Sequence, residues 1–415
     1  MEESGDIDRS NSDWIRLNVR ASEAFTPAAP IDAKELFAGR TEQLDTLIDA
    51  ICQRGQHAII YGERGVGKTS LATIQAQFLE DIGKRVVAPR INCDSSDNFS
   101  TLWKKVFAEV QVSKRIKKIG YQAAEEVEVE VSDISETLQE VISPNDVRVR
   151  LTELCQGAIL VVILDEFDRI EDERVKVQFS DTIKALSDYS VPATIVLVGV
   201  ADSVTDLIAH HESIERSLVQ IPLPRMKPAE MEQILSKAME KLAMQMELNA
   251  SLRIAGIARG LPHYVHLVGL NATREAIAAR RLNVTAEDVE KGIEKSIANA
   301  QQSIRQMYYD ATISRKKGSI YSRLLLACAL AKADEFGYFT AADIREPMSL
   351  IMKKNYTIPY YAKQLHELCK KSRGAVLQKP EDKARPRFRF RNPLLQPHVI
   401  MQGFKDGMRP LPLAG

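Results

Sequence analysis

The sequence has no paired cysteines and no long hydrophobic run. Its five cysteines are widely spaced, and none belongs to a C-x-x-C pair: Cys52, Cys93, Cys155, Cys328 and Cys369. This spacing excludes a disulfide framework or a zinc site and predicts small core residues in a reducing compartment. The apolar run at 158–164 is far shorter than the ~20 residues that a membrane-spanning helix needs, so we expect no membrane contact.

Extremes of composition are also absent. Of the 415 residues, 45% are hydrophobic and 27% are charged, which excludes a mostly disordered chain, a collagen-like chain and a coiled-coil rod. At about 150 residues per domain, the length predicts roughly three domains. The first residues, MEESGDIDRS, are acidic and polar and show no targeting pattern, so we expect a cytoplasmic protein.

The net charge of zero hides an asymmetry along the chain. Residues 301–415 contain 21 Lys and Arg against 9 Asp and Glu, a net charge of +12, whereas residues 1–300 carry −12. A basic last domain indicates contact with a polyanion such as DNA. A solubilising basic surface is the alternative explanation of the same charge.

Buried strands and amphipathic helices alternate over residues 35–225. Four apolar runs predict buried strands: 57–62, 85–93, 158–168 and 193–202. Helices are predicted at 41–52, where leucine and isoleucine recur at spacings of three and four, and at 69–83. The alternation predicts an α/β domain with a parallel sheet and crossover helices.

The rest of the chain divides into an arm and two further domains. Residues 1–34 lack periodicity and contain prolines, which predicts a flexible N-terminal arm or a strap. Residues 226–310 are almost wholly helical in pattern and predict a helical lid. Residues 311–415 predict three helices and then two short strands, at 374–379 and 385–392, the order of a winged helix-turn-helix domain.

One segment of the sheet domain is strongly acidic. Residues 121–140 contain seven acidic residues and no Lys or Arg, shortly after the basic run 113–118. The EVEVEV stretch within the segment alternates with a period of two, which is typical of a strand with one glutamate face. We interpret the segment as a solvated insertion, with a partner-docking hairpin as the alternative.

The strongest motif is GERGVGKT at 62–69, which satisfies G-x-x-x-x-G-K-[ST] between a predicted strand and a predicted helix. Glycines let the backbone curl so that successive N–H groups point at phosphate oxygens, and the start of the helix adds partial positive charge. Lys68 can bridge the β- and γ-phosphates of a nucleotide, and the Thr69 hydroxyl can bind Mg²⁺. The motif predicts a nucleoside triphosphate site.

The second motif is VVILDEFDRI at 161–170, where a buried strand ends in acidic residues. Ligands of open α/β sheets bind at the carboxyl ends of the strands, so Asp165 is placed to hold Mg²⁺. Glu166 follows at a position suited to polarise an attacking water.

Together these residues resemble the AAA+ ATPases, especially the origin-recognition (Orc-like) branch and the related STAND signalling ATPases, over about residues 36–300. The Orc-like branch also shares a C-terminal winged helix. FAGR at 37–40 resembles the short box that lies against adenine, while GERGVGKTS resembles Walker A and VVILDEFD resembles Walker B. The resemblance implies that ATP and Mg²⁺ are bound and that these residues contact the nucleotide: Phe37, Gly39, Arg40, Gly62, Glu63, Arg64, Gly65, Val66, Gly67, Lys68, Thr69 and Ser70.

Three further positions resemble catalytic elements of the family. Asp202 stands where the family has sensor 1, a polar residue that orients the attacking water, although an acid that caps the next helix is the alternative. Arg216 lies just before a predicted last strand and resembles the arginine finger that reaches the γ-phosphate in a neighbouring subunit. Arg225 is the second candidate for that role. A finger of this kind implies a homo-oligomer.

The sequence departs from the Orc-like pattern at GLPH, residues 260–263. Orc-like members often have an arginine in this sensor 2 region, where this chain has His263. The Gly-Leu-Pro sequence resembles the STAND proteins, in which the proline packs near adenine, so Pro262 and His263 join the expected nucleotide contacts. A histidine titrates near neutrality, and slow hydrolysis is therefore expected.

The last predicted helix and the strand pair carry the candidate DNA contacts. IPYYAKQLHELCKK places apolar side chains on one face and polar side chains elsewhere, as a recognition helix requires, and RPRFRFRN alternates arginine with phenylalanine. The DNA-facing residues are predicted to be the following: Tyr360, Lys363, Gln364, Lys370, Arg387 and Arg389. A charged edge strand in a protein-binding domain is the alternative for the arginines.

Two functions therefore remain open from the sequence. In the first, binding and hydrolysis of Mg-ATP switch the assembly of the protein and its contact with DNA or a protein partner. In the second, a STAND-type scaffold is locked by nucleotide, hydrolyses it weakly and acts in transposition or phage defence through a partner effector. No nuclease or protease motif is evident, so an output chemistry would come from that partner.

Overall fold

The computed structural model describes residues 10–408 except at several positions. The exceptions are 32, 111, 116–128, 133–139, 156–157, 202–203, 205–206, 209–210, 315–318 and 381–385; at 112–115, 129–132 and 211–213 the backbone alone is described. Contacts divide the chain into two compact units. The first unit comprises residues 1–39, 63–67 and 224–415, and the second comprises residues 40–62 and 68–223.

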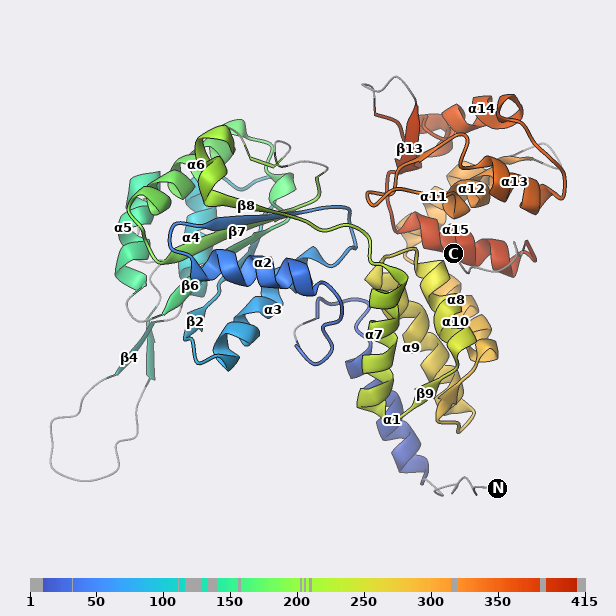
Figure 1. Cartoon of the computed structure of the whole chain (residues 1–415), viewed down its shortest axis with the longest axis horizontal. Coiled ribbons are helices and arrows are strands. Elements are labelled where there is room, and N and C mark those ends of the chain that lie inside the picture. Colours follow the sequence, from blue (N-terminus) through green and yellow to red (C-terminus); the bar gives the residue numbers. More distant parts are fainter. Residues whose placement is uncertain are drawn as a thin grey trace. The chain divides into compact units, whose positions relative to one another are not determined.

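The second unit is a parallel sheet with helices on both faces (Figure 1). The strand order is β2-β6-β7-β1-β8, with β3 also paired to β6. The strands are β1 (His57–Tyr61), β2 (Val86–Val87), β3 (Arg90–Asn92), β6 (Ile159–Asp165), β7 (Ala193–Gly199) and β8 (Leu218–Pro222). The single strand predicted over 85–93 is two short strands along β6, because Pro89 lies between them and has no N–H to donate to the ladder.

Alternate side chains of these strands enter cores on opposite faces of the sheet. Leu160, Val162 and Leu164 of β6 pack in a core with Trp103 and Phe179, as the two-residue period of a strand requires. The helices α4 to α6 cover that face, and α2 and α3 cover the other (Figure 1). Their bounds are α2 (Thr41–Cys52), α3 (Lys68–Asp81), α4 (Phe99–Glu109), α5 (Pro144–Leu154) and α6 (Glu173–Asp188).

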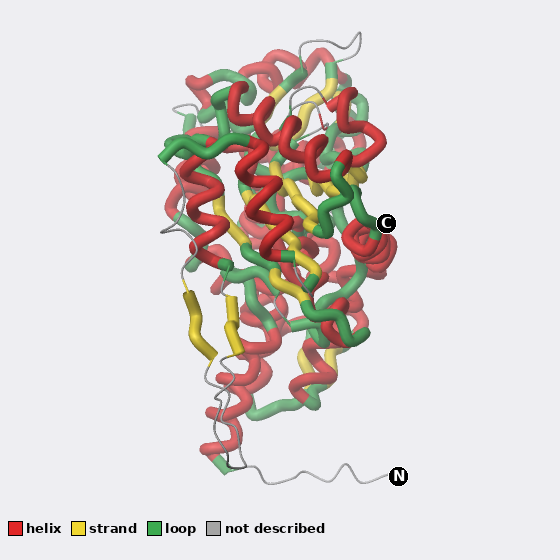
Figure 2. Tube along the Cα trace, turned by 90° about the vertical axis from the view of Figure 1, so that its left-hand side faces the viewer, coloured by secondary structure: helices red, strands yellow, loops and turns green. Residues whose placement is uncertain are grey.

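The segment around the acidic stretch contains a hairpin. The strands β4 (Val112–Arg115) and β5 (Val129–Ser132) pair antiparallel, with Val112 opposite Ser132 and Arg115 opposite Val129, and lie side by side in Figure 2. The last three residues of EVEVEV belong to β5, in agreement with the strand that the alternation suggested there. The rest of the acidic stretch, apart from Glu140, lies outside the described residues.

The N-terminal segment, for which a flexible arm or a strap is predicted, contains a helix that the sequence did not predict. Residues Asn11–Ala24 form helix α1, which begins at Ser10 with a capping box to Asp13. Leu17, Ala21 and Ala24 are buried, and α1 packs against α7 and α9 of the same unit. The buried positions recur at spacings of four and three, as in any amphipathic helix. Two of the three are alanine, however, so the sequence carries only a weak hydrophobic signal there.

The predicted helical lid is a bundle of four helices in the first unit. They are α7 (Pro228–Leu242), α8 (Leu248–Ala258), α9 (Pro262–Ala278) and α10 (Ala286–Ala298). Two-residue strands β9 (Gln245–Met246) and β10 (Asn283–Val284) pair in parallel beside them. A capping box between Thr285 and Asp288 begins α10, and Arg281 pairs with the buried Asp288 at 2.6 Å.

The last part of the chain is a winged helix. Its strands β11 (Phe339–Thr340), β12 (Leu377–Gln378) and β13 (Arg387–Phe390) form an antiparallel sheet in the order β11-β13-β12. Its helices are α11 (Gln302–Thr312), α12 (Tyr321–Leu330), α13 (Arg345–Met352), α14 (Ile358–Glu367) and α15 (Leu395–Lys405). The three predicted helices and both predicted strands are present, and α11, β11 and α15 are additions. The domain limits 35–225, 226–310 and 311–415 stay predictions.

Among the described residues, no helix combines the length and apolar character that crossing a membrane requires.

The docking of α1 generates a stability prediction. Leu17 is 2% exposed, whereas Val19 on the same helix is 56% exposed. We expect Leu17→Ala to weaken the docking of α1 by about 2–5 kcal/mol through lost contacts and a cavity, and Val19→Ala to leave it nearly unchanged. Hydrogen exchange of the amides in residues 14–24 measures this directly. Equal exchange rates in the two variants would show that α1 does not depend on its buried face.

Candidate functional site

The glycine-rich loop joins the end of β1 to the start of α3. Gly62, Gly65 and Gly67 have φ angles of 152°, 86° and 99°, which side chains rarely permit. A Cβ atom on Gly62 would lie 2.3 Å from the main-chain oxygen of Leu223, so only glycine fits there. The three glycines therefore give the loop the curled backbone that phosphate binding requires.

In the second unit, Lys68 begins α3 and is nearly buried, at 9% exposure. Its Nζ donates a hydrogen bond of 3.0 Å to the main-chain oxygen of Gly62. The ammonium group is thus held at the base of the loop, where its donors can turn toward a phosphate oxygen.

Thr69 and Asp165 meet in the second unit although 96 residues separate them. The Thr69 hydroxyl donates a hydrogen bond of 2.8 Å to Oδ2 of Asp165, and Oδ1 accepts one of 2.9 Å from the main-chain N–H of Glu166. Asp165 is 5% exposed and ends β6, as the sequence predicted. A hydroxyl beside a carboxylate is an oxygen-rich pair that suits Mg²⁺.

Glu166 has a left-handed backbone, with φ 56°, and its side chain is 54% exposed. Its Oε2 accepts a hydrogen bond of 3.0 Å from Nη1 of Arg169, three residues further on, which raises the pKa of Arg169. Arg169 is not among the residues expected from the sequence, although it lies three residues after Glu166 within the second motif.

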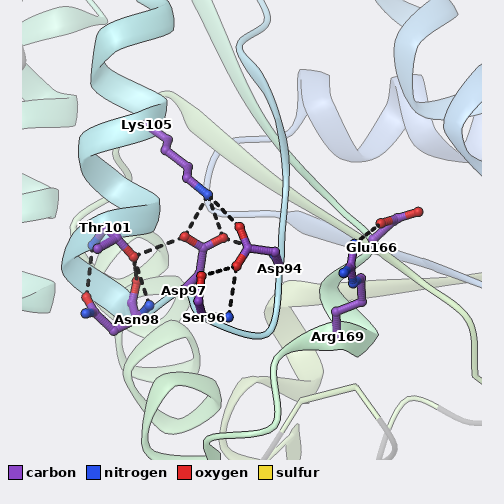
Figure 3. A network of polar contacts seen from close by, with 8 residues as sticks. All are labelled: Asp94, Ser96, Asp97, Asn98, Thr101, Lys105, Glu166 and Arg169. Carbon is purple, nitrogen blue, oxygen red and sulfur yellow. Dashed lines mark hydrogen bonds and ion pairs between the residues drawn. The ribbon is translucent and has the colours of Figure 1, made fainter.

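A polar network follows β3 in the second unit (Figure 3). β3 runs beside β6 with Asn92 opposite Asp165, and the N–H of Cys93 donates to the main-chain oxygen of Asp165 at 2.8 Å. Lys105 then bridges Asp94 and Asp97 at 3.1 and 2.7 Å. Hydrogen bonds from Ser96 and Lys105 hold the pKa of Asp94 well below its usual range. The network fixes the backbone next to Asp165.

The predicted sensor residue and the two predicted finger residues differ in where they lie and in how exposed they are. Asp202 lies outside the described residues. Arg216 lies in the last turn of the 3₁₀ helix His211–Ser217, just before β8. Its side chain is 85% exposed, with a long ion pair of 3.4 Å to Asp188. The alternative finger, Arg225, is instead 9% exposed and pairs with Glu63 at 2.6 Å in the first unit. An arginine buried in this way does not present its guanidinium to a neighbouring subunit.

The predicted adenine box packs on α7 of the first unit. Phe37 is 9% exposed, and its main-chain oxygen accepts a hydrogen bond of 2.5 Å from Nζ of Lys237. The N–H of Gly39, whose φ is 64°, donates to Oε1 of Gln233 at 3.0 Å. Arg40, which begins α2 in the second unit, is 6% exposed.

Pro262 and His263 begin α9 in the first unit. The Cγ atom of Pro262 lies 3.8 Å from where a Cβ on Gly67 would be, so the proline sits beside the loop. Burial lowers the pKa of His263, and its Nδ1 is 2.7 Å from the main-chain oxygen of Pro27. Burial therefore works against a charged histidine at this position.

The candidate recognition helix is α14 of the winged helix. Tyr361 and Leu365 are buried, whereas Tyr360 is 55% exposed and Lys363 is exposed. This confirms the predicted division of α14 into two faces. Lys370, just beyond the helix, is also exposed, while Gln364 is half-buried.

The candidate wing is β13, where the predicted alternation is confirmed. Phe388 and Phe390 are each 1% exposed, and Arg387 and Arg389 point away from that core. Both guanidinium groups lie over the ring of Tyr338, at 4.7 and 4.5 Å from its centre, and Arg387 also pairs with Asp334 at 3.0 Å. These arginines are therefore partly engaged within the domain.

The comparisons with known proteins agree with this site. Residues 36–198 match the family model described as AAA ATPase domain, a range that includes the glycine-rich loop, Asp165 and Glu166. This part of the chain is therefore similar to an AAA ATPase domain. No curated protein sequence matches the chain.

Solved structures with similar architecture cover most of the chain at low identity. The ORC2 protein of Aeropyrum pernix, in ADPNP and ADP complexes, is 17% identical with a TM-score of 0.48, covering 93% of this chain and 98% of that chain. Cdc6p of Pyrobaculum aerophilum is 15% identical with a TM-score of 0.46, covering 94% and 99%. The Aeropyrum pernix ORC1 protein, in complex with DNA, is 13% identical with a TM-score of 0.47, covering 93% and 96%.

Proposed function

We propose that the protein binds Mg-ATP and hydrolyses it to ADP and phosphate. The observation that carries the proposal is the contact between Thr69 of the glycine-rich motif and Asp165 at the end of β6. These two residue types, at a curled loop and an adjacent strand end, are the arrangement that holds a magnesium-bound triphosphate. The match of residues 36–198 to the AAA ATPase domain supports the same activity.

The chain's own groups divide the binding of ATP between them. Main-chain N–H groups of residues 62–69 donate to the phosphate oxygens, and Lys68 turns from Gly62 toward the β- and γ-phosphates. Phe37 and Pro262 supply apolar contacts for the base. Thr69 and Asp165 would hold Mg²⁺, which when bound neutralises charge on the phosphates.

Hydrolysis needs a base beside the attacking water. Glu166 accepts the proton of this water as its oxygen attacks the γ-phosphorus, and the bond from the γ-phosphorus to the bridging oxygen breaks to release ADP. The carboxylate must leave Arg169 to do so. Because that pair is about half exposed, its net contribution is small and its separation is easy.

We further propose that ATP switches an assembly of several copies. Arg216 supports this, since its side chain is 85% exposed and its ion pair with Asp188 is long, at 3.4 Å. In an oligomer it would reach the γ-phosphate bound by a neighbouring copy. Asp202 is proposed to orient the water. The alternative is a STAND-type scaffold that hydrolyses weakly and acts through a partner effector, which the neutral His263 favours.

Contact of the winged helix with DNA is part of the proposal. The net charge of +12 over residues 301–415 and the exposed polar face of α14 support it. Lys363, Lys370 and Tyr360 would face the duplex, with Gln364 beside them. Arg387 and Arg389 would contact phosphates while their guanidinium groups remain over the ring of Tyr338.

The first prediction of this proposal concerns nucleotide affinity. Lys68→Ala removes charge-assisted hydrogen bonds to phosphate, so we expect ATP to bind roughly 10- to 100-fold more weakly. Lys84→Ala, which changes an exposed lysine of the same unit, should bind ATP as the unaltered protein does. Isothermal titration calorimetry measures both. Equal ATP affinities of the two variants would show that ATP does not bind at this loop.

The second prediction separates binding from turnover. Glu166→Gln keeps the size of the side chain but cannot accept the proton of water, so we expect ATP affinity to persist while phosphate release slows about 10²- to 10⁴-fold. Glu171→Gln is the matched control, because Glu171 is exposed and lies shortly after Glu166. Turnover at the normal rate in Glu166→Gln would exclude this residue as the base.

The third prediction concerns DNA. We expect binding to a generic duplex to weaken steeply with salt, because lysines on DNA displace counterions. The double substitution Lys363→Ala/Lys370→Ala should lower the slope of log affinity against log salt by about 2, while Lys405→Ala on α15 should not change it. Fluorescence anisotropy across a salt series measures these slopes. Absence of DNA binding at low salt would support the scaffold alternative.

A further inference from the structure

Glu63, the second residue of the glycine-rich motif, is engaged in a buried ion pair within the first unit. Its side chain is 4% exposed and that of Arg225 is 9% exposed. Nε of Arg225 donates to Oε2 of Glu63 at 2.6 Å, and Nη2 donates to Oε1 at 3.3 Å. This bidentate geometry fixes both the position and the orientation of the Glu63 carboxylate.

The same guanidinium group also reaches the winged helix. Nη1 of Arg225 donates to Oε1 of Gln396 at 2.6 Å, and Nε2 of Gln396 donates to the main-chain oxygen of Ala329 in α12 at 2.8 Å. Gln396 lies in α15 and is 2% exposed. In addition, the N–H of Arg225 donates to the main-chain oxygen of Glu335 at 3.2 Å. Arg225 therefore bonds the loop residue Glu63 on one side and the winged helix on the other.

Glu63 compensates the charge of Arg225, which lies beside a second buried arginine. Arg259 lies next to Arg225, whose Nη1 is 3.4 Å from the main-chain oxygen of Arg259. Burial, together with the charge of Arg225, lowers the pKa of Arg259 to about 10. Glu63 is the carboxylate paired with Arg225, and a buried charge that loses its partner is strongly unfavourable.

Leu394 of the winged helix makes a second contact with the loop, at Gly65. The Cδ2 atom of Leu394 lies 3.0 Å from where a Cβ on Gly65 would be, so a side chain at position 65 would require Leu394 to shift. The main-chain oxygen of Leu394 accepts a hydrogen bond of 2.6 Å from the hydroxyl of Tyr264 in α9. The turn before α15 is therefore fixed against the loop by contacts independent of Arg225.

We propose that Arg225 and Gln396 are positioning residues through which the winged helix holds the glycine-rich loop in its phosphate-binding shape. The inference rests on the proposed binding of ATP. A glycine-rich loop has many alternative conformations, and a loop already held in one of them loses less entropy when phosphate binds. Because coupling between two sites is reciprocal, ATP in turn stabilises the contact of the winged helix with the loop.

The coupling has a direct experimental test in Gln396→Leu. This substitution removes the acceptor for Arg225 and the donor to Ala329 without altering the nucleotide-binding residues. We expect ATP affinity to fall about fivefold or more. Gln396→Glu keeps an oxygen acceptor for Arg225 and should recover much of the affinity, and Gln402→Leu on the same helix should match the unaltered protein. Titration of each full-length variant with ATP measures these affinities.

Hydrogen exchange gives a second readout, which begins with the unaltered protein. There, ATP should slow hydrogen exchange at residues 334–340 and 395–399, whereas adenosine, which lacks phosphates, should not. In Gln396→Leu the protection by ATP should be lost. A merely structural role for Gln396 would lower the thermal stability of the variant without making exchange in these segments depend on phosphate.

The outcomes separate this inference from the proposed function. If the unaltered protein and Lys68→Ala bind ATP equally weakly, the ATP site itself fails. If the unaltered protein binds ATP and Gln396→Leu binds it equally or more tightly, the coupling is overturned and the ATP site stands. Absence of ATP-dependent protection at residues 334–340 and 395–399 in the unaltered protein overturns the coupling as well.

Discussion

The hydrogen bond from Thr69 to Asp165 is the interaction on which the rest of the site depends. It joins the start of α3 to the end of β6, two elements far apart in the sequence. The bond can form because β1, β7 and β6 are parallel neighbours, so their carboxyl ends share one edge of the sheet. The loop leaves β1 at that edge only because Gly62 has no side chain to collide with Leu223. Backbone sterics and strand order thus place the hydroxyl and the carboxylate together.

Different contacts fix the two ends and the middle of the glycine-rich loop. Gly62 and Lys68 are held by contacts of the sheet unit, whereas residues 63–67 contact the lid and the winged helix. Among the charged residues of 63–67, Glu63 is buried and Arg64 is exposed, so the ion pair of Glu63 is the contact that fixes this part of the loop.

Features with local signals could be predicted from the sequence. The curled loop, the acidic end of β6 and the inward phenylalanines of β13 each follow from glycine spacing or a two-residue period. Helix α1 was missed because alanines make up much of its buried face, and burial by α7 and α9 is a tertiary effect. The Glu63–Arg225 pair spans 162 residues and has no signal in spacing. The neutral state of His263 follows from its burial, which only the fold reveals.

The two ion pairs that involve glutamates of the motifs differ in how readily they separate. The Glu166–Arg169 pair is about half exposed, and such pairs contribute about 0–1 kcal/mol, so the carboxylate can exchange between Arg169 and water. The Glu63–Arg225 pair is almost fully buried, and loss of one partner from such a pair typically costs about 3–5 kcal/mol. Glu63 therefore stays paired while Glu166 moves. The group that accepts a proton is mobile and the group that shapes the loop is fixed, as a catalytic base on a preorganised phosphate site requires.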